Sequence, residues 1–82
     1  MKTIQIAPYK QDCKIDGHKI VGTMGKRTFV FEIPEQYEIP AEIHDGLISN
    51  FCEAIALSSK HWQVERVLND AWQIEGGKFY EQ

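Results

Sequence analysis

Apolar and polar residues alternate along the first third of the chain, which is the pattern of half-buried β-strands. The alternation begins at residues 2–6 and returns over residues 13–23, where Asp16-Gly17 suits the positive φ angles of a type I′ hairpin turn. Gly25-Lys26 marks a second turn. Residues 28–33 follow, and every second side chain there falls on one face: Phe29, Phe31 and Ile33. This part of the chain predicts four strands.

A helical period replaces the alternation after a loop that Pro34 and Pro40 bracket. Pro40 suits the first turn of a helix, because its missing N–H is not needed there. Over residues 41–59 the apolar side chains cluster on one side of a helical wheel: Ile43, Leu47, Phe51, Ala54 and Ile55. We therefore predict an amphipathic helix that buries Phe51 against the sheet. Gly46 weakens this helix by about 1 kcal/mol relative to Ala.

The last third of the chain is predicted to return to strand. Its alternating apolar positions are Trp62, Val64, Leu68, Trp72 and Ile74, with a turn at Asn69-Asp70. Gly76-Gly77 predicts one more turn, and the two tryptophans are expected in the core. The predicted fold is a single α+β domain over residues 1–82: a small antiparallel β-sheet of about five to six strands, in the order β-β-β-β-α-β-β, with one amphipathic helix packed on one face.

Charge is distributed unevenly along the chain, whose net charge is −3. Residues 1–28 hold six basic and two acidic side chains, whereas residues 29–59 hold six acidic side chains and no Lys or Arg. Five of these six are predicted to share the loop and the outer helix face: Glu35, Glu38, Glu42, Asp45 and Glu53. Such a one-sign surface attracts a basic partner and speeds association with it. The alternative is an ordinary solvated helix face.

Residue patterns that carry catalysis or metal binding are not found in the sequence. The three histidines are His18, His44 and His61, and no two of them are spaced three or four residues apart. There is no nucleophile elbow, P-loop or dinucleotide-binding pattern. We therefore expect no enzymatic activity, no metal and no cofactor.

The cysteine pattern and the N-terminus bear on the compartment. Cys13 and Cys52 form no CxxC pair, so we expect two free thiols in a reducing cytoplasm, with one disulfide between them as the alternative. No apolar run has the length of a signal peptide or a membrane span. The prediction is a cytoplasmic protein that does not contact a membrane.

These observations favour a non-catalytic protein-binding module whose partner has a basic surface. The contact residues are predicted to be the five acidic residues above together with Phe79 and Tyr80, because aromatic side chains often anchor interfaces. We recognise no family motif. In size and plainness the chain is comparable to phage and mobile-element accessory proteins, which include inhibitors of host enzymes and defence nucleases and would act in the host cytoplasm.

Two alternatives stay open. The basic N-terminal hairpins could bind nucleic acid, since Lys26 and Arg27 precede Phe29 and Phe31 on one strand, as in sheets that stack RNA bases. The net negative charge disfavours that hypothesis. The chain could also be a small subunit of a larger assembly, and a homodimer is compatible with its pattern. The sequence names neither the partner nor the source organism.

Overall fold

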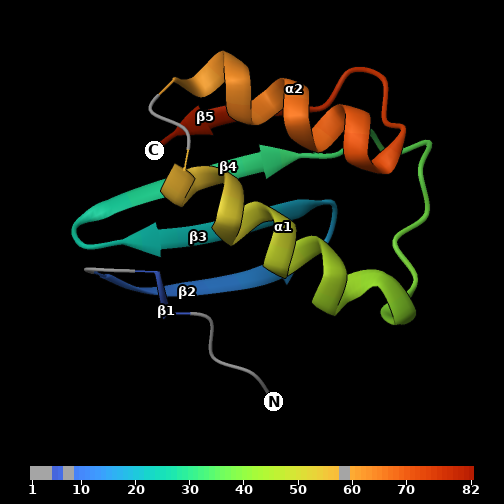
Figure 1. Ribbon diagram of the computed structural model, residues 1–82. Helices are drawn as coiled ribbons and strands as arrows, with labels where there is room; N and C mark the ends of the chain where they lie inside the picture. The colour runs from blue at the N-terminus through green and yellow to red at the C-terminus, as the bar shows by residue number, and fades with distance from the viewer. Residues whose placement is uncertain (1–4, 7–8, 58–59) are drawn as a thin grey trace.

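Two helices cover one face of an antiparallel sheet in the computed structural model, which describes residues 5–6, 9–57 and 60–82 (Figure 1). The strands lie side by side in chain order: β1 (Gln5–Ile6), β2 (Tyr9–Asp16), β3 (Lys19–Met24), β4 (Arg27–Glu32) and β5 (Lys78–Glu81). The helical layer consists of the 3-10 turn η1 (Ala41–Ile43), α1 (His44–Leu57) and α2 (His61–Trp72). The α+β class and the antiparallel sheet are as predicted, whereas the second helix is not.

Strands β2, β3 and β4 form a meander whose tight turns depend on glycine. Gly17 and Gly25 have φ angles of 63° and 64°, which residues with a Cβ rarely adopt. Asp16 pairs with Lys19 across the first turn, so its two central residues are Gly17 and His18, one position later than expected. The predicted strand at residues 2–6 is seen as β1 at its last two residues, and the others lie outside the described part of the chain.

The strand register separates a helix-covered face from an open face. Ile20, Phe31 and Phe79 form one cross-strand row beneath the helices, and all three are buried. The expected burial of Phe29, Phe31 and Ile33 is confirmed. On the opposite face, Val21, Val30 and Tyr80 form the matching row.

Helix α1 packs on the sheet through the side chains that its helical period predicted. Phe51 is fully buried, and Leu47, Ala54 and Ile55 join it in the core. Gly22 on β3 makes this contact possible, because a Cβ there would lie 2.6 Å from the Phe51 ring. The predicted helix at residues 41–59 is therefore confirmed as η1 followed by α1, and its last two positions lie outside the described residues.

Helix α2 occupies the segment where two strands and a turn were predicted, so that prediction is wrong. Val64, Leu68 and Trp72 are spaced by four residues, a spacing that fits both the strand period of two and the helical period of 3.6. The helix ends at Gln73, whose left-handed φ of 54° caps it. Only β5 follows, so the element order is β-β-β-β-α-α-β.

The two tryptophans differ in burial. Trp72 is half-buried and packs against α1, where a Cβ on Gly46 would lie 3.1 Å from its ring. Trp62, in the first turn of α2, is 59% exposed. The expected core position is therefore wrong for Trp62, because the helix turns that side chain away from the sheet.

Cys13 and Cys52 form a disulfide that joins β2 to α1. The expectation of two free thiols is wrong, and the alternative that the sequence left open is the observed one. Cys13 lies on the helix-covered face opposite Gly22, and α1 brings Cys52 down onto the same place. The two cysteines are 39 positions apart, so the sequence gave no local sign of this proximity.

Candidate functional site

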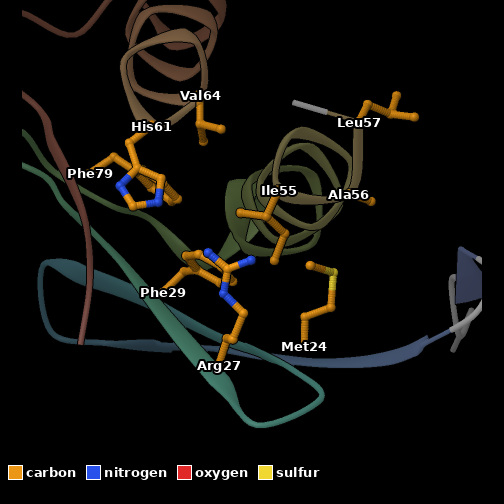
Figure 2. Close-up of a pocket in the computed structure, with 9 residues that line it drawn as sticks. All are labelled: Met24, Arg27, Phe29, Ile55, Ala56, Leu57, His61, Val64 and Phe79. Atoms are coloured by element: carbon orange, nitrogen blue, oxygen red, sulfur yellow. The ribbon is translucent and has the colours of Figure 1, made fainter. Parts of the chain in front are cut away.

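A pocket of about 310 Å³ opens where α1 ends, α2 begins and the β3–β4 hairpin turns (Figure 2). Its lining is mainly apolar: Met24, Phe29, Ile55, Ala56, Leu57, Val64 and Phe79, with Arg27 and His61 as the polar members. The Arg27 guanidinium and the His61 ring lie on the sheet side of the pocket, and Leu57 points outward at its rim. Leu57 is 74% exposed.

The polar side of this pocket is a network of Arg27, Glu81 and His61. Arg27 donates from Nε to Glu81 Oε2 at 2.9 Å and from Nη2 to Oε1 at 2.8 Å. His61 Nε2 lies 3.7 Å from the same Oε1. The hydrogen bonds from Arg27, helped by its charge, hold the pKa of the Glu81 carboxyl below its usual value, and they raise the pKa of Arg27.

Stacked rings form the floor beneath this network. Phe29 and Phe79 stack with centroids 5.7 Å apart, and the His61 ring meets Phe79 edge-on at 5.3 Å. The Arg27 guanidinium lies 4.9 Å from the Phe29 centroid, in a cation–π contact. Both rings and the neighbouring Ile55 are buried, so the floor belongs to the core of the domain.

The five acidic residues predicted to contact a partner are all exposed. Glu35 and Glu38 lie in the loop after β4, Glu42 lies in η1, and Asp45 and Glu53 lie on α1. None of the five forms an ion pair with another residue in the part of the chain that the structure describes. The structure thus gathers Glu42, Asp45 and Glu53 on the outward side of one helical segment.

Phe79 and Tyr80 were both expected to be accessible to a partner, but they differ in burial. Phe79 is only 6% exposed and packs under the helices, so its side chain does not project from the surface as expected, and its ring instead lines the pocket. Alternation along β5 sends Tyr80 to the open face, where its hydroxyl donates to Glu32 Oε2 at 2.5 Å. That hydrogen bond raises the pKa of Tyr80.

The network, the pocket and the exposed apolar residues of α2 were not predicted from the sequence. Arg27 and Glu81 are 54 positions apart, so nothing local links them. Trp62 and Val67, which is 51% exposed, were hidden by the strand prediction. If residues 61–72 are placed on a helical wheel, Trp62 and Val67 lie outside the apolar stripe of Val64, Leu68 and Trp72. This pattern was the signal available in the sequence.

Two of the histidines lie against backbone carbonyl groups. His18 Nε2 lies 2.8 Å from the Tyr37 carbonyl, and His44 Nε2 lies 3.2 Å from the Ile39 carbonyl. No cluster of three His, Cys, Asp or Glu side chains that could hold a metal occurs among the residues described. No helix in the same part of the chain is both long and apolar enough to cross a membrane.

Comparison with known proteins adds no relative: no family model, curated protein or solved structure matches this chain. Functional inference therefore depends on the molecule's own surface. Two features of the described surface matter here: the acidic side chains along η1 and α1, which form no ion pair with a described residue, and the pocket at the end of α1.

Proposed function

We propose that this protein is a non-catalytic protein-binding module that docks its acidic segment, from Glu35 to Glu53, onto a basic surface of another protein. The observation that carries the proposal is the exposure of all five acidic residues without an ion pair to any described residue. Carboxylates that have no intramolecular counter-charge keep their full attraction for an external cation.

The rigidity of α1 supports this proposal. The helix is anchored by five buried side chains, Leu47, Phe51, Cys52, Ala54 and Ile55, and by the disulfide to β2. Asp45 and Glu53 are therefore displayed at fixed positions. A preorganised surface loses less conformational entropy on binding than a flexible one does.

The nucleic-acid alternative receives less support. Phe29 and Phe31 are buried beneath the helices, so neither ring offers a face for base stacking. Arg27 is engaged by Glu81. The acidic segment would repel a phosphate backbone.

The test compares three immobilised baits in nuclease-treated lysate: wild type, the face reversal Glu42→Lys/Asp45→Lys/Glu53→Lys, and a matched control. The control reverses Asp16, Asp70 and Glu75, three exposed acidic residues outside the segment, and changes the net charge equally. Circular dichroism checks that each bait is folded.

We expect a protein that is retained by wild type and by the control, is lost from the face reversal, and elutes with added salt. Equal retention on all three baits would contradict the proposal. The expectation that the partner is a host enzyme or defence nuclease inhibited stoichiometrically stays a prediction, and identifying the retained protein tests it.

A further inference from the structure

The acidic face of α1 and the apolar pocket lie next to each other. Glu53 precedes Leu57 by four residues, so the two side chains are neighbours on the helix surface. Leu57 lies at the outer rim of the pocket, and Ile55 points from α1 toward the Phe29 and Arg27 side chains that line it (Figure 2). A segment that follows the acidic residues along α1 therefore reaches the pocket at the end of the helix.

The pocket accepts an uncharged group. Its cation, Arg27, is neutralised by a bidentate pair with Glu81, so an anionic ligand would have to compete with a carboxylate already in place. Seven of the nine lining residues are apolar, and the polar part of the pocket surface, to which Arg27 and His61 belong, is nearly as large as the apolar part. A volume of about 310 Å³ lies at the small end of the range for ligand sites, which suits a single large side chain better than a cofactor.

We propose that this pocket receives one bulky apolar side chain of the partner, carried on a basic segment that lies along α1. This inference depends on the proposed function and names the anchor of the same interface. Buried apolar anchors beside charged contacts are the usual energetic centre of protein interfaces. The acidic side chains provide attraction and orientation, and the pocket provides the short-range apolar burial.

Charge complementarity fixes the approach along α1 rather than α2. Lys60, which precedes α2, and Arg66, in the middle of α2, are exposed cations that repel a basic segment. Arg66 is 3.9 Å from Asp70 across a pair that is about three-quarters exposed, so its charge is only weakly balanced. Asp45 and Glu53 on α1 have no such basic neighbours in the described chain.

The test uses a synthetic lysine-rich helical peptide with one central phenylalanine, titrated into protein with isotope-labelled methyl groups. We expect NMR shifts at the Leu57 and Val64 methyls, which line the pocket. The Val67 methyls, on the outward side of α2, should not shift. Replacing the peptide phenylalanine by alanine should weaken binding about tenfold. Equal binding of the alanine peptide would overturn the proposal.

Two matched protein variants locate the anchor. Leu57→Ser removes the apolar rim of the pocket at an exposed position and should weaken binding about tenfold, whereas Val67→Ser makes a comparable change on the exposed side of α2 and should leave binding unchanged.

The outcomes separate this inference from the proposed function. Binding that is lost in Glu53→Lys but kept in Leu57→Ser overturns the pocket anchor and leaves acidic docking in place. Binding that neither change affects overturns both. Self-association of the free protein that shifts the same methyls would assign the pocket to a second copy and overturn a heterologous partner.

Discussion

Helices α1 and α2 lie over the same face of the sheet but are held there in different ways (Figure 1). Helix α1 buries five side chains and is joined to β2 by the disulfide. Helix α2 buries only Val64 and Leu68 fully, and it adds polar contacts to β5 and to the turn before it. Glu65 accepts a hydrogen bond from the Phe79 backbone N–H at 3.0 Å, and Asn69 donates to the Gly77 carbonyl.

This difference shows which parts of the two helices stabilise the fold and which parts are left as exposed surface. Helix α1 owes its position to apolar burial and a covalent link, so its outer face is free to carry unbalanced negative charge. Helix α2 closes the sheet edge, because β5 is the last strand and Glu65 occupies one of its outward N–H groups. The pocket forms where the two helices meet the β3–β4 hairpin.

The largest expected effect comes from removing the main anchor of α1. Phe51→Ala should lower the free energy of unfolding by about 3–5 kcal/mol, because a fully buried ring leaves a cavity. Urea unfolding measures the change, and Val64→Ala serves as the corresponding change on α2, with a smaller expected loss. A midpoint unchanged from wild type in Phe51→Ala would refute the anchoring role.

The covalent link is the next way to separate the helices. Replacing Cys13 and Cys52 together by Ala should cost about 2–4 kcal/mol, because the bridge closes a loop of 39 residues in the unfolded chain. Thermal unfolding with and without a reducing agent measures the effect, which should appear in wild type and vanish in the double variant. Thiol titration of unreduced wild type should find no reactive thiol, and a count of two would contradict the bridge.

A smaller effect is expected where α2 closes the sheet edge. Glu65→Ala should cost about 1 kcal/mol, because the Phe79 N–H loses its acceptor. Arg66→Ala, on the exposed side of the same helix, is the control and should change the urea midpoint little. Equal effects of the two substitutions would show that the edge contact does not stabilise the domain.

The smallest effect concerns the ion pair at the pocket. The pKa of Glu81 is lowered in the folded state, chiefly by the hydrogen bonds from Arg27. The stabilisation is therefore fully present above the unfolded-state value of about 4.3 and is lost as pH falls through the lower folded-state pKa.

Urea unfolding of wild type and Arg27→Gln across pH measures this contribution. The small difference at neutral pH should shrink on acidification and with added salt. A difference that grows as the pH falls would contradict the assignment.

Local pattern was sufficient for part of the fold. The glycine turns, the alternation of Phe29 and Phe31, and the helical spacing around Phe51 each lie within a few residues, so the period of burial was visible in the chain. The burial period did not identify α2, because a spacing of four residues agrees with both the strand period of two and the helical period of 3.6. Phe79 was also predicted to be accessible. An aromatic residue after two glycines gives no sign that its strand, β5, pairs with β4 and places the side chain in the core.

By itself, the sequence determined the α+β class, the N-terminal meander, helix α1 and the concentration of acidic residues on its outer side. The tertiary structure alone decided which residues meet: Cys13 with Cys52, Arg27 with Glu81, and Leu57 with the pocket walls. The physical reason is how far apart along the chain the contacting residues lie. Secondary structure follows from the burial period of adjacent residues, whereas these contacts join residues up to 54 positions apart and exist only once the helices have packed on the sheet.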